Sequence, residues 1–434
     1  MSGIPSASLY ENARFNALVV VPNALQGIFR KRRAAVAVAT RANVDGHAVG
    51  LLAGMSRGHS GGPVWVRVVR ERALLLLTPA DVHRALEGSP DPFAADPSAK
   101  RDGMCAFQPD ALTISRGELW RGRRAFAEAV LDTVRPRHRL SERFGAVARE
   151  EVDAVAGTAA GELDYGAWSL AFRRIARRVV FGDGARDDEL LTDLLAELMS
   201  EANGMPGGPS ERYPELVDRI ERRIDAGEEG SLVSLFAEAP FDADTRVPGQ
   251  AIHWLFATGD TLAANSFRCL ALLASHPRQR QEATGELKAD SGERPYLEAC
   301  LNEAMRLWPT TSMLARVTLA DTDWRGTTVP AGTQVVIVNG FLHRDAERHP
   351  WADRFAPERW TEGDAGESWS FNHFSRGPQG CPGAGLALLL GGEALAQVLG
   401  DRTVELRSHE LDPERPLPHM LDFFGLRFGL APAS

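Results

Sequence analysis

The chain has 434 residues, enough for one large domain or two to three average ones, and 44% of its residues are hydrophobic. A formal net charge of −9 argues against nucleic acid as the main partner. The four cysteines are scattered and follow no Cys-x-x-Cys spacing: Cys105, Cys269, Cys300 and Cys381. They indicate neither a disulfide scaffold nor a cysteine metal cluster, and they favour a reducing cytoplasm.

The first sixty residues are loosely patterned and carry a basic cluster at residues 30–33. The longest early apolar stretch, residues 17–22, is too short for a signal core, and residues 73–77 are too few to span a membrane. We therefore expect a soluble, cytoplasmic protein without a membrane anchor.

From residue 64 the pattern predicts a β-hairpin followed by a helix. Residues 64–69 are β-branched and aromatic, and the apolar run 73–77 follows after a charged turn. Thr78 and Pro79 then suit the N-cap and the first position of a helix. Residues 89–109 contain several prolines and are expected to form a loop.

Four helices are expected next, at residues 119–126, 165–182, 187–202 and through 223, with a glycine- and proline-rich break at 203–210. In the first of them Trp120 and Arg124 are four residues apart and share one face. Taken alone, these residues favour an amphipathic helix with solvated arginines.

The longest predicted helix covers residues 248–277, with apolar residues at near-helical spacing and a proline at its end. Polar residues interrupt it at Ala257-Thr258-Gly259-Asp260-Thr261. A buried helix that carries a glycine, an acid and a hydroxyl together indicates that something uses them. A threonine can also simply bond back to a carbonyl of its own helix.

The last third of the chain predicts one further helix and several strands. In the helix at 296–307, Glu303 and Arg306 are three residues apart and can form an ion pair. Strands are expected at 315–319 and 334–338, and 416–429 should end in a final strand.

The glycine-rich loop at residues 371–385 surrounds Cys381 and precedes an apolar helix at 386–399. A nest of backbone N–H groups and a helix start both favour a thiolate, which is the form that binds metals. The alternative is an ordinary buried cysteine in a glycine-rich turn.

The spacing Phe374-x-x-Gly377-x-x-x-Cys381-x-Gly383 resembles the haem-binding loop of the cytochrome P450 family. This resemblance extends from about residue 64 to the C-terminus. It implies a mainly α fold with a small β portion, and haem b between the long central helix and the cysteine loop. Cys381 would be the axial thiolate, whose electron density favours O–O cleavage. We expect a single domain over residues 1–434, β-rich at about 50–80 and 315–340.

The resemblance also implies roles for further residues. Phe374, Gly377, Gln379 and Gly383 of the loop would contact the haem. Its propionates would be bound by Trp120, Arg124 and Arg316, which all donate hydrogen bonds.

Two other sets of residues match motifs of the family. Asp260 and Thr261 would deliver protons during catalysis. Glu303, Arg306 and Arg359 resemble a structural Glu–Arg–Arg triad that would lock the loop bearing the cysteine.

The sequence departs from the family pattern at two positions. The glycine expected at Thr258 stands at Gly259 instead, which affects the width of the oxygen groove. Gln379 stands where relatives usually carry arginine or histidine, and it can donate only a neutral hydrogen bond to a propionate.

The expected activity is that of a monooxygenase, which puts one atom of O₂ into an apolar small molecule such as a natural product. Electrons would come from a ferredoxin and a ferredoxin reductase. The alternatives are a peroxide-driven peroxygenase, whose known members lack the Asp-Thr pair, and a non-enzymatic haem-binding protein. Candidate walls of the substrate pocket are residues 89–114, 310–314 and 420–424.

Residues 116–149 form an arginine-dense segment that is a candidate docking surface for an acidic ferredoxin. Nine arginines stand there against four acids, which are Glu118, Glu128, Asp132 and Glu142. A solvated helix surface explains the same pattern equally well.

Overall fold

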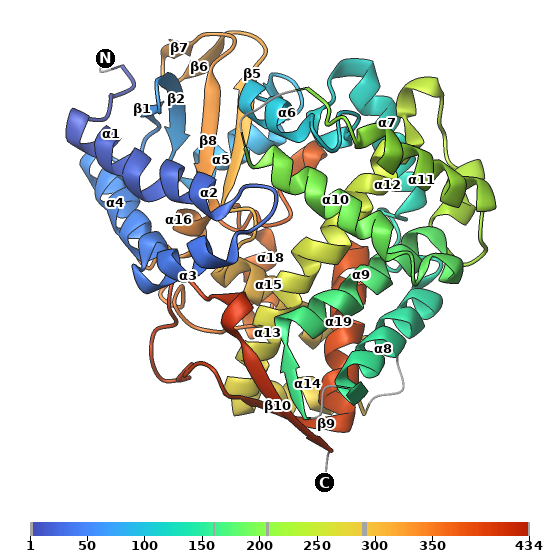
Figure 1. The fold of residues 1–434 in the computed structure, drawn as a ribbon. Coiled ribbons are helices and arrows are strands. Elements are labelled where there is room, and N and C mark those ends of the chain that lie inside the picture. Colours follow the sequence, from blue (N-terminus) through green and yellow to red (C-terminus); the bar gives the residue numbers. More distant parts are fainter. Residues whose placement is uncertain (1–2, 159–160, 205–207, 289–292, 433–434) are drawn as a thin grey trace.

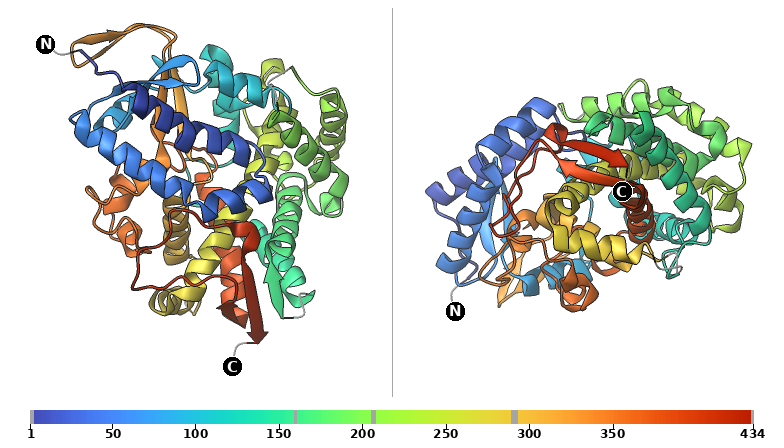
Figure 2. Two further views of the ribbon diagram at one scale, coloured as in Figure 1. Left: turned by 60° about the vertical axis from the view of Figure 1, so that its left-hand side comes forward. Right: turned by 90° about the horizontal axis from the view of Figure 1, so that it is seen from below.

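A computed structural model of the chain describes residues 3–158, 161–204, 208–288 and 293–432. Helices dominate the fold, and a small β portion lies at one side of the helical body (Figure 1). Figure 2 shows the N-terminal helices along one side of the molecule and the helices of residues 117–226 along the other. The mainly α architecture expected from the sequence is confirmed.

Residues 9–58 are mainly helical, although their sequence is loosely patterned. Five segments follow one another: α1 (Leu9–Phe15), the π-helical η1 (Asn16–Val20), α2 (Val21–Gln26), α3 (Arg33–Arg41) and α4 (Val44–Gly58). Helix α4 buries Ala48, Leu51, Leu52 and Met55 at helical spacing, while its exposed face is rich in glycine. The β-rich part therefore begins at residue 64 and not near residue 50.

The main sheet has the strand order β1-β2-β8-β5-β3. Its strands are β1 (Val64–Val68), β2 (Glu71–Leu76), β3 (Phe93–Ala94), β5 (Met313–Thr318) and β8 (Gln334–Val338). The expected hairpin is confirmed, with Val64 opposite Leu75. Strand β2 pairs in parallel with β8, so the sheet joins the early part of the chain to residues 313–338. Two short strands, β6 (Thr322–Trp324) and β7 (Thr327–Val329), pair separately.

Helix α5 (Pro79–Glu87) begins as the sequence predicts, because Thr78 Oγ1 accepts a hydrogen bond from the N–H of Asp81 at 3.2 Å. The following stretch was expected to be a loop, but it contains strand β3 and helix α6 (Ser98–Met104). Helix α6 has no side-chain cap at its start, so the usual signal of a helix N-terminus is missing there.

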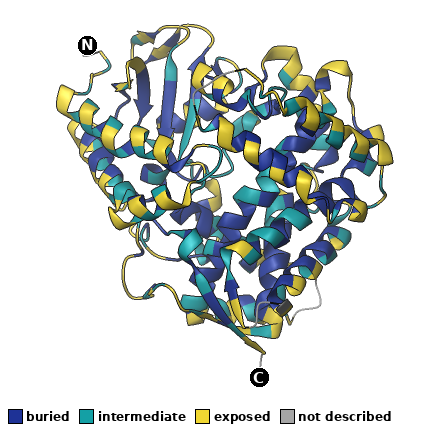
Figure 3. Cartoon of the chain, in the orientation of Figure 1, coloured by how far each residue is buried: buried dark blue, intermediate teal, exposed yellow. Residues whose placement is uncertain are grey.

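The helical body contains each helix predicted for it and two more, α8 and α14, that were not predicted. Its elements are α7 (Gly117–Val130), α8 (Ser141–Thr158), α9 (Tyr165–Phe181), α10 (Glu189–Ala202), α11 (Tyr213–Ala226), α14 (Pro277–Glu286), α15 (Pro295–Leu307) and α19 (Ala384–Asp401). The predicted break at 203–210 includes residues 205–207, which lie outside the described residues. Figure 3 shows the centre of this body as its most buried part.

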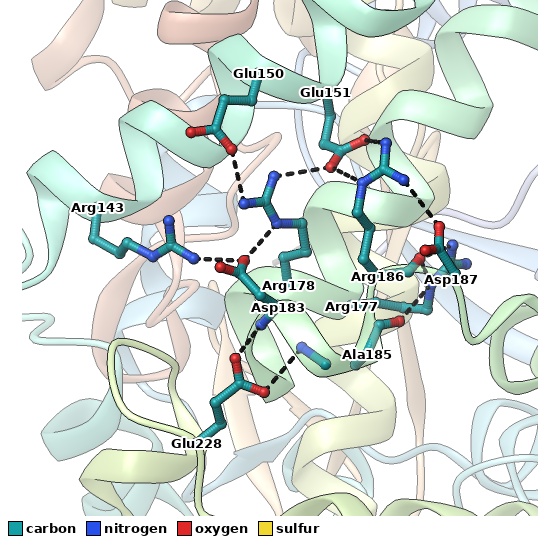
Figure 4. Close-up of polar contacts among 11 residues, drawn as sticks. Arg143, Glu150, Glu151, Arg177, Arg178, Asp183, Ala185, Arg186, Asp187 and Glu228 are labelled. Atoms are coloured by element: carbon teal, nitrogen blue, oxygen red, sulfur yellow. Dashed lines mark hydrogen bonds and ion pairs between the residues drawn. The ribbon is translucent and has the colours of Figure 1, made fainter.

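Buried ion pairs hold helices α8 and α9 together near the segment that leads into α10 (Figure 4). Arg178 binds Glu151 at 2.8 Å, and Asp183 at 2.7 Å, while Arg186 binds Glu151 at 2.7 Å. Because Arg178 and Glu151 are both buried, removing either one would leave an unpaired charge in the interior.

Helix α19 lies in the core and packs against α8 and α15. Among the described residues it is the one helix long and apolar enough to cross a membrane by length and composition, but 61% of that window is buried inside the protein. Burial of this kind is what a core helix requires, so its apolar character is explained by packing.

The C-terminal part forms a second small sheet from β4 (Glu162–Asp164), β10 (Arg427–Pro432) and β9 (Arg402–Leu406). The final strand thus exists, but it starts later than the sequence pattern suggests. Phe424 belongs to a 3₁₀ turn, Phe423–Gly425, in which Asp422 accepts a hydrogen bond from the N–H of Phe424. That cap turns the backbone before the strand begins.

Candidate functional site

The cysteine loop runs from Phe371 through a 3₁₀ turn at Gly377–Gln379 into helix α19. The N–H of Cys381 donates to the carbonyl of Phe374 at 2.8 Å, which folds the loop back on itself. Thr133 Oγ1 fixes the next residue by donating to the carbonyl of Pro382 at 2.7 Å. Cys381 is exposed, so its thiol is available to a ligand.

The electrostatics of Cys381 differ from the expectation drawn from the sequence. Its thiol is accessible, yet protein atoms crowd it, and this partial burial raises its pKa. The N–H of Gly383 and the charge of Arg124 act in the opposite direction but do not outweigh burial. The loop alone therefore does not favour the thiolate over the thiol.

Helix α15 holds the start of the loop through two histidines. His373 Nε2 bonds to Asn302 Oδ1 at 3.0 Å. The N–H of Asn372 donates to His343 Nε2 at 2.9 Å, and His343 Nδ1 lies 3.1 Å from the carbonyl of Arg306. Since Nε2 accepts a hydrogen bond, we assign the proton to Nδ1 and a neutral ring to His343. Burial also lowers the pKa of this histidine well below its usual value.

Glu303 and Arg306 form a fully buried ion pair, as the sequence predicts, with both contacts at 2.7 Å. Glu303 also accepts from the N–H of Ala356 at 3.0 Å and from the indole of Trp360 at 2.8 Å. Arg306 in turn donates to three carbonyls, those of His343, Ala352 and Arg354.

The expected third member of this triad, Arg359, does not join it. Among the described residues, Arg359 pairs with Asp364 at 3.4 Å, on the partly exposed side of the short helix α17 (Glu358–Thr361). Residues next to each other on a helix point about 100° apart, so turning Trp360 toward Glu303 turns Arg359 away. An indole N–H satisfies the carboxylate without adding a second charge to the interior.

Gly377 is required by the packing of the loop against helix α5. Its φ of +67° is left-handed, and a Cβ at this position would lie 2.3 Å from the carbonyl oxygen of Leu86. A side chain here would therefore collide with backbone and not with a flexible neighbour. Gly383, which precedes α19, leaves room for a Cβ, with Leu131 the nearest neighbour at 3.7 Å.

Arg316 of strand β5 is 3% exposed and has no carboxylate within 4 Å among the described residues. Its partners are neutral: Ser89 Oγ at 2.9 Å, Ser375 Oγ at 3.2 Å and a backbone carbonyl. Burial lowers its pKa to about 10. A buried guanidinium without a counter-charge suits an anionic ligand such as a carboxylate, so this residue fits the expected propionate partner.

Helix α7 carries Trp120 and Arg124, and it reaches the cysteine loop through Arg124. Arg124 donates to the carbonyl of Gly380 at 2.5 Å and pairs with Glu128 at 2.6 Å. Trp120 packs against the main core, and its indole N–H makes no hydrogen bond within the described part of the chain. The indole donor thus remains available to a ligand.

Gln379 and Phe374 complete the expected cofactor residues. The Oε1 atom of Gln379 is buried and lacks a hydrogen-bond partner among the described residues. Phe374 is partly buried and packs against the main core. An orphaned polar atom beside the cysteine is consistent with a site that is completed by a bound group.

The long central helix consists of α12 (Val247–Phe256), the π-helical segment η6 (Ala257–Leu262) and α13 (Ala263–Ser275). The polar interruption seen in the sequence is therefore a π-bulge, a feature frequent at functional sites. Gly259 does not widen the groove, because its Cβ position faces Arg173 and Ala176 of α9 at 3.7 and 3.8 Å. The shifted glycine serves close helix packing.

Asp260 and Thr261 both line a cavity of about 280 Å³. Neither side chain forms a hydrogen bond with a described residue. Thr261 thus does not bond back to its own helix, whereas Ser266 does so, to the carbonyl of Leu262 at 2.8 Å. Burial raises the pKa of Asp260, and the charges of Arg173 and Arg30 oppose this shift.

Two of the three predicted wall segments border this cavity. Thr310, Thr311 and Ser312 line it, as do four residues of the last segment, namely Met420, Leu421, Phe423 and Phe424. Residues 89–114, all described, contribute nothing to it. The N-terminal helical segments line it instead, through residues such as Leu18 and Leu52.

Several residues of the site carried no signal in the sequence. His343 and Asn302 reach the loop from separate segments and belong to no local motif. Trp360 stands next to a predicted arginine, and only the structure shows which of the two turns inward. Arg268 lines the cavity on the helix that carries Thr261; its spacing of seven residues would have placed it on the same face.

Comparison with known proteins agrees with this arrangement. The family model described as Cytochrome P450 matches residues 243–422. The cyclooctat-9-en-7-ol 5-monooxygenase of Streptomyces melanosporofaciens is 28% identical over 76% of this chain and 79% of its own length. Cytochrome P450 3A31 of Mesocricetus auratus is 31% identical over 40% of both chains. Cytochrome P450 monooxygenase sphH of Aspergillus fumigatus is 33% identical over 41% of this chain and 36% of its own.

The protein therefore belongs to the cytochrome P450 family of monooxygenases, which are oxidoreductases that contain haem iron. The matches to the two shorter-aligned relatives span well under two thirds of their lengths.

Replacing Gly377 by alanine should destabilise the loop. The left-handed backbone alone disfavours alanine by about 1–2 kcal/mol, and the collision with the Leu86 carbonyl adds to this. We expect a lower thermal midpoint and less retained haem. The matched control is Gly385→Ala in α19, where a Cβ meets nothing within 4 Å and φ is ordinary. Equal stability of the two variants would contradict the packing role of Gly377.

The neutral state of His343 predicts a pH dependence of stability. Its pKa is lowered in the fold, whereas in the unfolded chain it titrates near about 6.5, so unfolding takes up a proton below that pH. His343 then lowers the free energy of unfolding by about 1.4 kcal/mol per pH unit as the pH falls below about 5.5. His343→Asn should make the pH dependence shallower by that amount in denaturant titrations. The exposed His47→Asn should leave it unchanged, and an unaltered slope in His343→Asn would exclude a neutral buried ring.

Proposed function

We propose that the protein is a haem b monooxygenase in which Cys381 is the axial ligand. Three observations support this: Cys381 is exposed, Arg316 is buried beside the cysteine loop with no carboxylate within 4 Å among the described residues, and Asp260 and Thr261 line a cavity. When bound, haem supplies the activation of O₂ that no side chain can perform. Arg316, Arg124 and Trp120 would hold its propionates, and Phe374, Gly377, Gln379 and Gly383 would form the loop around its thiolate side.

The role proposed for the central helix is proton delivery. Thr261 presents a hydroxyl to the cavity that its own helix does not use. Asp260 lies beside it, and burial raises the pKa of this carboxyl, which makes it a better proton donor near neutral pH. The π-bulge sets both side chains toward the cavity. Together they would pass protons from the cavity to the reaction site.

The substrate is proposed to be a small molecule with a large apolar part, such as a natural product. Apolar side chains line the cavity, among them Phe256, Leu307 and Phe423. The relative from Streptomyces melanosporofaciens is named as a monooxygenase of cyclooctat-9-en-7-ol.

A ferredoxin and its reductase are proposed as the electron donors. The arginine-dense segment at 116–149 offers less free charge than its sequence indicates, because at least eight of its nine arginines form ion pairs with carboxylates. A docking site there would thus depend only weakly on ionic strength.

The chain is further proposed to act as one domain, in the cytoplasm. In support, strand β8 of the main sheet lies between β2 and β5, so early and late parts of the chain share one sheet. A peroxygenase remains the alternative activity. It would turn over with hydrogen peroxide but not with a reductase system, and the cavity-facing Asp260 and Thr261 favour the monooxygenase.

The ligand assignment predicts a spectroscopic change. The reduced protein with carbon monoxide should absorb as a haem thiolate, and Cys381→Ser should lose that band because serine offers no thiolate. The control is Cys105→Ser, which should keep the band. A Cys381→Ser protein that still shows it would place the ligand elsewhere.

Thr261→Ala should uncouple the reaction. Haem and substrate binding should persist, while product formed per electron pair falls and hydrogen peroxide rises, since positioned proton transfer contributes about a hundredfold or more. Ser266→Ala removes a hydroxyl that is bonded back to the same helix, so its coupling should match the unmodified protein. Unchanged coupling in Thr261→Ala would reject the proton-delivery role.

A further inference from the structure

The cavity beside Thr261 is cationic, although the protein as a whole is acidic. Six cationic side chains and two carboxylates line it: Arg30, Lys31, Arg33, Arg173, Arg268 and Arg344, with Asp45 and Asp260. The basic cluster at residues 30–33 supplies three of them. A cleft lined by one sign of charge concentrates ligands of the opposite sign.

Not all of these cations are free to bind a ligand. Arg173 pairs with Asp193 at 3.2 Å, and Arg344 pairs with Asp353 at 2.8 Å. Arg30 and Arg33 donate to backbone carbonyls at the outer part of the cavity. Arg268 and Lys31 remain as the candidates for direct contact.

Arg268 is fixed in place but incompletely satisfied. One terminal nitrogen donates to the carbonyl of Trp308 at 3.1 Å and the other to that of Leu421 at 3.3 Å. The guanidinium lies over the ring of Phe423, with its Cζ 4.8 Å from the centroid. No carboxylate lies within 4 Å among the described residues. Each terminal nitrogen therefore keeps one N–H without a protein partner, the arrangement that a bidentate carboxylate requires.

Lys31 adds a second positive charge at the same end of the cavity. It forms neither a hydrogen bond nor an ion pair with a described residue, and burial together with the charge of Arg268 lowers its pKa to about 8. Asp45 and Asp422 are the acids whose charges reach Arg268, but neither pairs with it. Burial raises the pKa of Asp45 and so favours its neutral form, which makes it a weaker counter-ion for these two cations.

We propose that this cavity binds a substrate with an apolar body and a terminal carboxylate, and that Arg268 receives the carboxylate with Lys31 beside it. The proposal rests on the proposed monooxygenase function and names the substrate class of that same site. Arginine is suited to this task because its planar fork matches a carboxylate and its charge is constant.

The helix that carries both Thr261 and Arg268 sets the distance between them. Seven residues separate them, which is two helical turns or about 10 Å along the axis on the same face. Ala264 lies between them on the cavity wall. A carboxylate held by Arg268 therefore places a carbon about 10 Å away beside Thr261, so oxidation is expected toward the far end of the molecule.

The test compares dodecanoate with dodecanamide, which differ in charge but hardly in size. Isothermal titration calorimetry on the haem-loaded protein should show the acid binding about ten- to a hundredfold more tightly. Arg268→Gln should abolish that preference while leaving the affinity for the amide in place. Arg268→Lys should retain part of it, and Arg415→Gln, at an exposed arginine that does not line the cavity, should retain all of it. Equal affinity of the unmodified protein for the two compounds would overturn the proposal.

The calorimetric result is independent of the haem assignment. If the carbon monoxide band is present but the acid is not preferred, the substrate class is wrong and the monooxygenase function stands. If the acid is preferred but the thiolate band is missing, the function is wrong and the anion site stands. A preference for the acid that persists in Arg268→Gln would place the carboxylate on another residue and would also overturn the assignment.

Discussion

The site depends on one buried ion pair, that of Glu303 and Arg306. Two charges in the interior are tolerated only when hydrogen bonds satisfy them fully. Here the carboxylate is bonded by Ala356 and Trp360 as well as by its arginine, and the guanidinium is bonded to three carbonyls. These bonds connect helix α15 to the segment 343–360. The main effect of the ion pair is therefore to hold this irregular segment in one conformation, and its contribution to the free energy of unfolding is secondary.

A histidine connects this ion pair to the loop that carries the cysteine. The carbonyl of Arg306 orients His343, whose other nitrogen accepts the N–H of Asn372 at the start of the loop. The loop then closes on itself between Phe374 and Cys381. A glycine-rich segment, which would otherwise have many conformations, is held by contacts from outside. The thiol of Cys381 is thus accessible although the loop around it is held in one conformation.

How much could be foreseen from the sequence depended on whether a feature is local. Thr78-Pro79, the 248–277 helix and the Glu303–Arg306 pair are encoded by neighbouring residues, and the structure contains all three. The N-terminal helices were missed because glycine-rich α4 has low helix propensity and gains its stability from packing. The prediction that Arg359 joins the triad was wrong, because adjacent residues on a helix point in different directions and Trp360 is the one that points toward Glu303. His343 acts across a long separation, which no pattern within one segment can reveal. Arg268 lies seven residues after Thr261 on one helix, so its place on the cavity face was a local signal that the motif analysis did not use.

The parallel pairing of β2 with β8 has a consequence for how the molecule folds. Bringing together strands so far apart along the chain requires closing a very long loop, a slow step that local helix formation does not need. Arg316 lies on β5 beside β8, and its guanidinium bonds to Ser89 from the early part of the chain. The contacts of this buried arginine are therefore complete only when the first and last thirds of the chain have met. A ligand that binds at Arg316 would thus bind the closed sheet and stabilise it against opening.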